Sequence, residues 1–314
     1  MVLTGATGFI GSALAQDLVR AGHDVVCLLR REALVPDGAR AIILPEPWSC
    51  EQLEEAIGAI EPAILFHLAG GPRGDPGTLY RDNVVLGELV MAAMARAAPE
   101  ARTLVIGSAA EYGLPAPDGA CRESAVPVPV SSYGIAKLAL THHAQLRMVR
   151  GQEIVVARLF NPVGAGMGPG LAFSDFARRL ARNSECLLTG DIDTSRDFFD
   201  VAEATRILLA LALHPEARGR VVNVCSGVAT PVRAGVERLV ALAARRGGTA
   251  ARIERDPALM QAGVRCLYGS TDQLDELAIR PASPEIGPAL EALFDRSLAL
   301  TGSAPDSIPS QKPA

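Results

Sequence analysis

Three glycines at intervals of three, near the start of the chain, constrain its fold more than any other feature. The apolar stretch Val2-Leu3-Thr4 leads directly into Gly5, Gly8 and Gly11, and residues 12–22 then carry apolar side chains at helical spacing. We interpret this region as a strand, a tight turn and the beginning of a helix. That order is typical of the first half of a βαβ unit, whose glycine turn holds the pyrophosphate of a dinucleotide.

Steric arguments give each glycine a separate role. Gly5 permits a backbone conformation that a side chain would forbid, Gly8 lets a bound group approach the main chain, and Gly11 lets the helix lie against the strand. Free N–H groups at the start of the helix would point at an anion. A glycine-rich turn without a ligand is the alternative, but the position of the turn between a strand and a helix favours cofactor binding.

The residues after the second predicted strand bear on which dinucleotide is bound. Residues 23–29 are typical of a buried parallel strand, and Arg30 and Arg31 follow them. A carboxylate at this place takes the ribose hydroxyl of NAD, whereas an arginine accommodates the extra phosphate of NADP. We therefore expect NADP(H), held by Arg30 and Arg31. NAD(H) stays open as the alternative, with the two arginines forming a solvated pair.

Strands and helices are predicted to alternate over about the first 160 residues, and the pattern is less regular afterwards. The later strands are expected at residues 41–44, 63–71, 102–106, 154–160 and 221–225, and the later helices at 51–60, 84–97, after Tyr133, and at 171–182 and 204–213. In the strand at 63–71, His67 is expected to be a packed core residue and not a ligand. This pattern predicts an α/β fold with a doubly wound parallel sheet of the Rossmann type.

The same pattern suggests a division of the chain. A dinucleotide-binding domain is expected over residues 1–160 together with about 199–225. A smaller α/β region that binds the substrate is expected over residues 161–198 and 226–300. Residues 301–314 are expected to form a disordered tail.

Composition excludes several classes of protein. A net charge of −5 without a long run of Lys or Arg argues against nucleic-acid binding, and no apolar run is long enough to span a membrane. The six cysteines form no Cys-x-x-Cys pair, which argues against a zinc site or a disulfide framework. Because the glycine turn begins almost at Met1, no signal peptide is expected. We expect a cytoplasmic α/β protein without a metal site.

Three further residues carry acid–base chemistry. Tyr133 and Lys137 are four residues apart, and on a helix they share one face. A phenol titrates near pH ~10, and a nearby ammonium group is expected to lower that pKa. Ser108 follows a predicted strand, where parallel sheets place groups that face a ligand. Together they would supply a proton donor, a group that tunes it and a group that polarises a carbonyl or an alcohol. A surface pair without function is the alternative for Tyr133 and Lys137.

As a set, these motifs resemble the extended short-chain dehydrogenase/reductases of the nucleotide-sugar epimerase, dehydratase and reductase kind. The resemblance runs from Thr4 to about Leu298 and is carried by residues 4–11, 67–70, 108–113, 133–137, 158–164, 196–198 and 223–227. Residues 107–113 and 222–227 most resemble the GDP-4-keto-6-deoxymannose reductases.

The resemblance implies roles for individual residues. It implies a catalytic Ser108, Tyr133 and Lys137. It also implies a set of residues around the cofactor: Gly5, Thr7, Gly8, Phe9, Ile10, Gly11, Leu68, Ala69, Asn83 and Phe160. Asn161 and Arg196 are implied on the diphosphate side of a nucleotide-sugar, where a guanidinium group suits phosphate oxygens. An ordinary ion pair of Arg196 with Asp193 or Asp197 is the alternative. Family members are often homodimers, and the helices near 84–94 and after Tyr133 could pair across a two-fold axis.

Departures from the family pattern separate the candidate reactions. Dehydratases carry an acidic residue one or two places after the catalytic Ser or Thr, where this chain has Ala109 and Ala110. Glu111 lies one place further and, on an extended segment, would point away from Ser108. This disfavours a dehydratase. Family epimerases usually keep a carboxylate after the second strand and hold NAD permanently, whereas Arg30 and Arg31 stand here, so we favour an NADPH-dependent reductase of a 4-keto nucleotide-sugar. A nucleotide-sugar 4-epimerase with tightly bound NAD is the second choice, followed by a reductase of other carbonyl compounds and a non-catalytic dinucleotide sensor.

Overall fold

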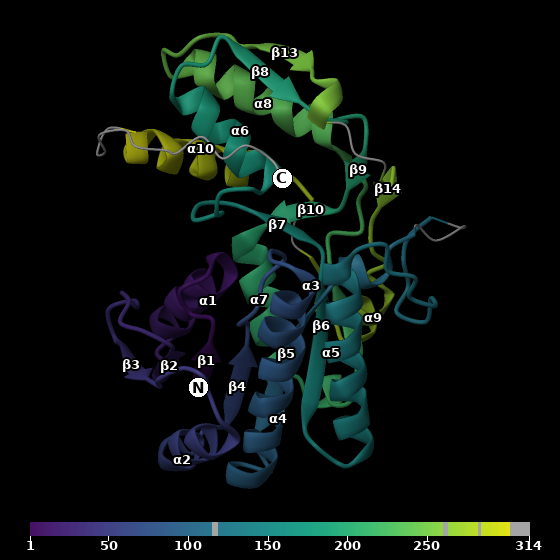
Figure 1. Cartoon of the computed structure of the whole chain (residues 1–314). Helices are drawn as coiled ribbons and strands as arrows, with labels where there is room; N and C mark the ends of the chain where they lie inside the picture. The colour runs from purple at the N-terminus through teal and green to yellow at the C-terminus, as the bar shows by residue number, and fades with distance from the viewer. Residues whose placement is uncertain (115–118, 260–262, 282–283, 302–314) are drawn as a thin grey trace. The chain divides into compact units, whose positions relative to one another are not determined.

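The computed structural model describes residues 1–114, 119–259, 263–281 and 284–301 (Figure 1). The chain divides into two compact units. The first consists of Met1–Pro162, Asp193–Pro231 and Ala262–Glu285, and the second of Val163–Ile192, Val232–Gln261 and Ile286–Ala314.

A parallel sheet of seven strands forms the centre of the first unit. In spatial order these strands are β11 (Val221–Val224), β6 (Ile154–Leu159), β5 (Arg102–Ser108), β4 (Ile64–His67), β1 (Val2–Thr4), β2 (Val25–Leu29) and β3 (Ala39–Ile43). All neighbouring pairs run parallel. The order of the strands reverses direction at β1 and β4, and open α/β sheets bind ligands beside such a point. The predicted doubly wound fold is confirmed.

Helices cover both faces of this sheet, and the alternation of side chains along the strands explains why. In β2, Val25, Cys27 and Leu29 face one hydrophobic cluster, whereas Val26 and Leu28 face another. The first face packs on α1 (Phe9–Arg20) and α7 (Val201–Leu213), and the second on α2 (Cys50–Ile60), α4 (Leu86–Ala97) and α5 (Ser132–Val149). Figure 1 shows α4 and α5 side by side on their face.

The helix predicted at 84–97 begins earlier than the pattern suggests. The Asp75 side chain accepts a hydrogen bond from the Thr78 amide at 3.1 Å and begins α3 (Pro76–Leu79). A π-helical turn, η1 (Tyr80–Val85), then connects α3 to α4. Asn83 therefore lies inside a helix instead of leading into one.

Short elements complete the first unit. They are β7 (Asn161–Val163) with β10 (Phe198–Asp200), β12 (Thr230–Pro231) with β9 (Ser195–Arg196) and β14 (Cys266–Leu267), the turns η2 (Ala109–Glu111) and η3 (Pro215–Ala217), and α9 (Asp272–Glu276). Strand β9 lies between β12 and β14, which ties three distant parts of the sequence together. For this reason residues 193–198, 226–231 and 263–281, which the sequence analysis groups with the substrate-binding region, lie in the first unit.

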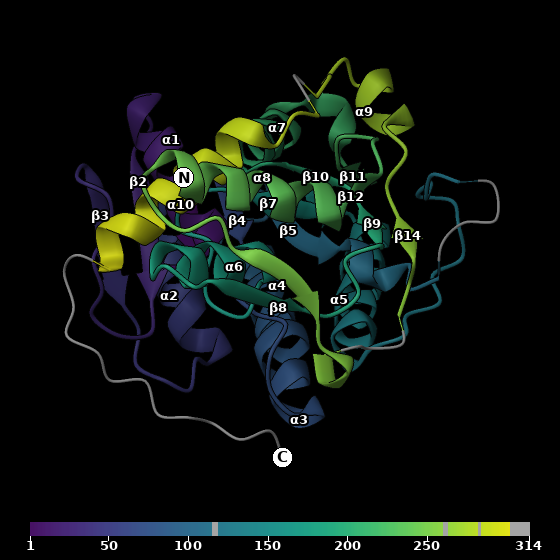
Figure 2. The ribbon, with the colours of Figure 1, turned by 90° about the horizontal axis from the view of Figure 1, so that it is seen from above.

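The second unit is built from three helices and a two-stranded sheet within the described residues. Its elements are α6 (Ala172–Ala181), β8 (Cys186–Thr189), α8 (Val232–Arg245), β13 (Arg252–Arg255), η4 (Pro257–Leu259) and α10 (Gly287–Thr301). Figure 2 shows α6, α8 and α10 packed beside one another. Gly235 permits this approach, because a Cβ atom there would lie 2.4 Å from the Phe173 ring. The predicted tail lies outside the described residues apart from Thr301, which ends α10.

Two findings concern the predicted cellular setting. Among the described residues, no helix combines the length and the apolar character needed to cross a membrane. All six cysteines are free.

Candidate active site

The glycine turn has the geometry that its sequence predicts. Gly5 adopts a φ of +74°, in the left-handed region that favours glycine. A Cβ atom on Gly11 would lie 2.1 Å from the Gly5 carbonyl oxygen, so only glycine lets α1 pack this closely on β1. The predicted conformational roles of Gly5 and Gly11 are confirmed.

The loop after β4 forms the neighbouring wall of this turn. A Cβ atom on Gly5 would lie 2.6 Å from the Ala69 nitrogen and from the Leu68 carbonyl carbon. The Leu68 amide donates to the Thr4 carbonyl at 3.2 Å, and the Ala69 amide to Thr4 Oγ1 at 3.4 Å. The structure therefore brings Leu68 and Ala69 beside the glycine turn, where the strand order reverses, and their contact with a cofactor stays a prediction.

The helix start beside this turn suits an anion. Gly8 caps α1 and provides no side-chain hydrogen bond, so the first amides of the helix have no side-chain partner. Thr7 and Gly8 are exposed, and Phe9 and Ile10 are partly exposed. The glycine turn from Gly5 to Gly11, called the glycine cradle below, leaves space that Cβ atoms would fill, and the helix after it has an uncapped N-terminus. Both features fit the pyrophosphate of a dinucleotide. Contact of these residues with a cofactor stays a prediction.

Two of the residues predicted beside the cofactor, Asn83 and Phe160, are buried. Asn83 has no exposed surface, and it bonds Gly71 through both its amide nitrogen (3.0 Å, to the carbonyl) and its oxygen (3.2 Å, from the amide). Phe160 packs in the core against Tyr112, with ring centres 6.2 Å apart. Asn83 therefore orders the loop after β4, and a direct cofactor contact of either residue remains untested.

Arg30 and Arg31 lie at the carboxyl end of the sheet, as predicted, but Arg30 has a partner there. Its guanidinium donates to Glu46 at 3.0 Å, and both side chains are more than half exposed. Arg31 is exposed and directly follows. An incoming phosphate would therefore compete with the Glu46 carboxylate for Arg30.

The three predicted catalytic side chains lie together. Ser108 ends β5, and its side chain lies near enough to Tyr133 to lower the pKa of that phenol. Lys137, one turn further along α5, has its Nζ 5.9 Å from the centre of the Tyr133 ring and donates to the Ile106 carbonyl at 2.9 Å. Gly134 allows this approach, since a Cβ atom there would lie 2.4 Å from the Ala110 carbonyl oxygen.

The expectation that Lys137 lowers the pKa of Tyr133 is wrong for the protein without ligands. Burial raises the pKa of Tyr133 to about 12, and the hydrogen bond from Ser108 only partly offsets this effect. Burial also lowers the pKa of Lys137 to about 8, against a raising effect of Glu111. Desolvation is the largest cause of both shifts, so Tyr133 holds its proton at neutral pH.

The expectation for Glu111 also needs correction. The segment after Ser108 is not extended, because Ser108 Oγ accepts from the Ala110 amide at 3.2 Å and caps the turn η2. Glu111 consequently turns back, and its carboxylate accepts a hydrogen bond from the Ser108 amide at 2.7 Å. It also pairs with Arg158 at 2.8 Å, and both side chains are buried.

On the predicted substrate side, an unpredicted carboxylate organises the backbone. Asp197 is buried and accepts hydrogen bonds from the amides of Ser226 (2.7 Å), Gly227 (3.0 Å) and Gly269 (3.1 Å). Its own carbonyl accepts from the amide nitrogen of the Asn161 side chain at 3.1 Å. Burial raises the pKa of Asp197, whereas these hydrogen bonds lower it. The carboxylate thus fixes the segment that carries Arg196, whose guanidinium donates to the Ser195 carbonyl at 2.8 Å.

Comparison with known proteins is consistent with this site. The model of the NAD dependent epimerase/dehydratase family matches residues 1–225. Over 299 residues the chain is 32% identical to GDP-6-deoxy-D-mannose reductase of Pseudomonas aeruginosa, with 88% of this chain and 90% of the relative covered. It is also 32% identical over 250 residues to dTDP-6-deoxy-L-talose 4-dehydrogenase (NAD(P)(+)) of Kitasatospora kifunensis, with 76% and 78% covered. The solved structure of RMD from Pseudomonas aeruginosa complexed with NADPH superposes with a TM-score of 0.78 at 27% identity, covering 95% of this chain and 99% of that one.

Proposed function

The chain belongs to the NAD-dependent epimerase/dehydratase family of nucleotide-sugar enzymes, and we propose that it is an NADPH-dependent reductase of a 4-keto nucleotide-sugar. It is an NAD(P)-dependent enzyme of the extended short-chain dehydrogenase/reductase type. The proposal concerns the direction of the reaction, the choice of cofactor and the substrate.

The placement of a protonated Tyr133 beside Lys137 and the end of β5 is the observation that carries the proposal. Reduction needs a proton donor beside the carbonyl oxygen, whereas epimerisation begins with a base that removes a proton from an alcohol. Because burial raises the pKa of Tyr133 to about 12, Tyr133 holds a proton that it can donate. The same observation makes the 4-epimerase with tightly bound NAD the second choice.

In the proposed mechanism, bound NADPH supplies the hydride that reduces the carbonyl carbon. Tyr133 gives its proton to the carbonyl oxygen, and the product is an alcohol. Ser108 hydrogen-bonds the same oxygen and polarises the carbonyl. The charge left on the Tyr133 oxygen is stabilised by Ser108 and by the positive charge of Lys137 until a proton returns from water.

The buried carboxylate of Glu111 argues against a dehydratase. Water elimination needs an acidic group free to exchange protons next to Ser108. Ala109 and Ala110 offer none, and Glu111 is occupied by three donors: the Ser108 amide, Thr141 Oγ1 and Arg158 Nε. An ion pair with a buried arginine keeps a carboxylate charged and in place.

The two residues after β2 support NADPH as the cofactor. They are Arg30 and Arg31, and a carboxylate in their place would favour NAD. The relative RMD is complexed with NADPH, and the talose dehydrogenase carries NAD(P)(+) in its name. For the substrate, Asn161 and Arg196 are proposed to bind the diphosphate, since an arginine fork matches phosphate oxygens.

A homodimer is proposed through α4 and α5. The surface of α5 exposes Ile135, Leu146 and Val149, of which Val149 is 87% exposed. Apolar side chains in such a position favour association with a second copy. Six free cysteines support a reducing compartment such as the cytoplasm.

The decisive experiment follows the consumption of NADPH by the purified enzyme with a panel of 4-keto nucleotide-sugars. We expect turnover with at least one of them and release of no tightly held NAD when the protein is denatured. Recovery of stoichiometric NAD, together with interconversion of two nucleotide-sugars without net consumption of NADPH, would support the epimerase instead.

A further inference from the structure

One buried carboxylate binds both elements that carry the proposed catalytic residues. Glu111 and Arg158 are almost inaccessible, with side chains 0% and 4% exposed. Glu111 Oε1 accepts from the Ser108 amide at 2.7 Å, at the end of β5. Glu111 Oε2 accepts from Thr141 Oγ1 at 2.9 Å, one turn after Lys137 on α5. Glu111 therefore fastens the strand end of Ser108 to the helix of Lys137.

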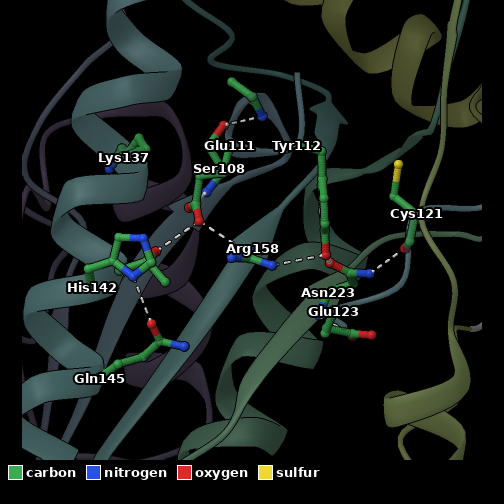
Figure 3. A network of polar contacts seen from close by, with 12 residues as sticks. Ser108, Glu111, Tyr112, Cys121, Glu123, Lys137, His142, Gln145, Arg158 and Asn223 are labelled. Carbon is green, nitrogen blue, oxygen red and sulfur yellow. Dashed lines mark hydrogen bonds and ion pairs between the residues drawn. The ribbon is translucent and has the colours of Figure 1, made fainter. Parts of the chain in front are cut away.

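Arg158 holds this carboxylate from the other side, and it is itself fixed. Its Nε donates to Glu111 Oε2 at 2.8 Å, and another of its nitrogens donates to the Tyr112 hydroxyl at 3.2 Å. The Tyr112 hydroxyl donates in turn to Asn223 Oδ1 at 2.7 Å, and Asn223 Nδ2 donates to the Cys121 carbonyl at 2.8 Å. Figure 3 shows these side chains in one continuous network.

The backbone around the carboxylate is adapted to it. Gly107 is the residue before the last one of the buried strand β5, and glycine weakens a strand. A Cβ atom at Gly107 would lie 2.6 Å from Glu111 Oε1, so glycine leaves the space that the carboxylate fills. Because a buried ion pair stabilises a fold no better than apolar side chains of the same size, its place beside Ser108 suggests a role in the reaction.

We propose that Glu111, held by Arg158, is a positioning residue that fixes Ser108 against Tyr133 and keeps negative charge beside Lys137. The inference rests on the proposed function, because it assigns those three residues to the reaction. The side chain of Glu111 has no exposed surface and all its bonds are internal, so it acts through its neighbours.

The negative charge of Glu111 acts on the pKa values of Lys137 and Tyr133 in the same direction. It raises the pKa of Lys137, which burial otherwise lowers to about 8, and it raises the pKa of Tyr133. The titratable groups that interact with Lys137 are Tyr133 on its own helix, Glu111 on η2 and His67 on β4. Removing the charge of Glu111 should therefore make Lys137 lose its proton at a lower pH.

The test uses a double variant, Glu111→Gln with Arg158→Met, which removes both charges and leaves no unpaired buried ion. We expect kcat to fall about 10- to 100-fold, while the KM for NADPH changes less than about 3-fold. The alkaline limb of the pH profile of kcat should move to lower pH. The matched control neutralises Arg102 and Glu153, a pair 3.4 Å apart and away from Ser108, as Arg102→Met with Glu153→Gln. This control should keep the wild-type kcat.

A second readout needs no substrate. The chain has only two lysines, Lys137 and Lys312, so selective isotope labelling of lysine gives two signals that can be titrated by NMR. In the Glu111→Gln, Arg158→Met variant, the pKa of Lys137 should fall below its wild-type value, with Lys312 as the internal reference. An unchanged titration of Lys137, or a kcat equal to wild type, would overturn the positioning role. A lower Lys137 pKa in the variant, together with a wild-type enzyme that reduces no 4-keto nucleotide-sugar, would overturn the proposed function alone.

Discussion

Lys137 Nζ lies 5.9 Å from the centre of the Tyr133 ring and donates its hydrogen bond to the Ile106 carbonyl, so the ammonium does not bond the phenol directly. Ser108 lowers the pKa of the phenol, but burial raises it by more. In the free protein, burial and not Lys137 therefore sets the direction of the Tyr133 pKa shift. The positive charge of Lys137 becomes useful when negative charge develops on the Tyr133 oxygen during proton transfer.

Replacement of Tyr133 by Phe tests this arrangement. Because the variant lacks the proton donor, we expect kcat to fall by at least about 100-fold, the usual contribution of a general acid. Binding of NADPH, measured by the quenching or transfer of protein fluorescence, should change little. The control is Tyr80→Phe, which alters an exposed tyrosine outside α5 and should leave kcat unchanged. A fully active Tyr133→Phe enzyme would remove Tyr133 from the mechanism.

Much of this site could be predicted from the sequence because its signals are local. The strand, turn and helix at Gly5 to Gly11 depend on backbone geometry that neighbouring residues impose. The pairing of Tyr133 with Lys137 depends only on helical spacing. Position at the end of β5 then brings Ser108 to them, since the carboxyl ends of parallel strands share one edge of the sheet.

The remaining features depend on burial and on contacts between distant segments. Asp197 binds amides of residues 226, 227 and 269, and nothing near Asp197 in the sequence indicates those partners. The direction of the Tyr133 pKa shift was predicted wrongly because desolvation depends on the surrounding packing. The sequence analysis expects Glu111 on an extended segment, which is wrong. The Ser-x-x-Glu pattern from Ser108 to Glu111 is a capping-box signal and indicates the turn that the structure shows.

Arg31 and Glu46 should affect the preference for NADPH in opposite directions. Replacing Arg31 by Ala removes a charge-assisted contact with the proposed phosphate, and we expect the Kd of NADPH to rise about 10-fold. Replacing Glu46 by Gln releases Arg30 from its 3.0 Å ion pair and should lower that Kd by about 2- to 5-fold. Isothermal titration with NADPH and with NADH measures both effects. Equal changes for the two cofactors would contradict a role in phosphate binding.

His67 should make the fold sensitive to acid. Its Nδ1 lies 2.8 Å from Thr4 Oγ1, its Nε2 is buried without a partner, and burial lowers its pKa to about 3. The unfolded chain takes up this proton near the ordinary histidine pKa, whereas His67 of the folded protein stays neutral, so stability is lost as pH falls from about 6.5 toward 3. Over that window we expect His67 to contribute a loss of up to about 1.4 kcal/mol of unfolding free energy per pH unit.

Urea denaturation at several pH values measures this slope. The variant His67→Asn keeps a polar atom near Thr4 but does not titrate, so its stability should fall less steeply below pH ~6.5. The control His142→Asn changes an exposed histidine on α5 and should keep the wild-type slope. Identical slopes for His67→Asn and wild type would show that another group governs the acid sensitivity.

Gly11 and Gly58 offer a matched pair of helix glycines. A Cβ atom on Gly11 would lie 2.1 Å from a backbone oxygen, which cannot move aside, so Gly11→Ala should lower the unfolding free energy by about 1–3 kcal/mol and abolish NADPH binding. A Cβ atom on Gly58 in α2 would lie 3.9 Å from Ala97 Cβ, an ordinary contact. Gly58→Ala should therefore stabilise the protein by about 0.5–1 kcal/mol. Thermal denaturation with and without NADPH measures both variants, and unchanged NADPH binding in Gly11→Ala would contradict the cradle.

The variant Arg196→Ala tests whether the substrate carries a diphosphate. If the Arg196 guanidinium binds phosphate oxygens, Arg196→Ala should raise the KM of the nucleotide-sugar about 10-fold, because a hydrogen bond between charged groups contributes about 1.5–3 kcal/mol. The kcat should stay within about 3-fold, since Arg196 does not take part in proton transfer. The control Arg252→Ala changes an exposed arginine of β13, paired with Glu254, and should leave both constants unchanged. A KM that stays constant in Arg196→Ala would favour a carbonyl substrate without a nucleotide. Such a substrate could equally be reduced by NADPH bound at the glycine turn, with Tyr133 as the proton donor.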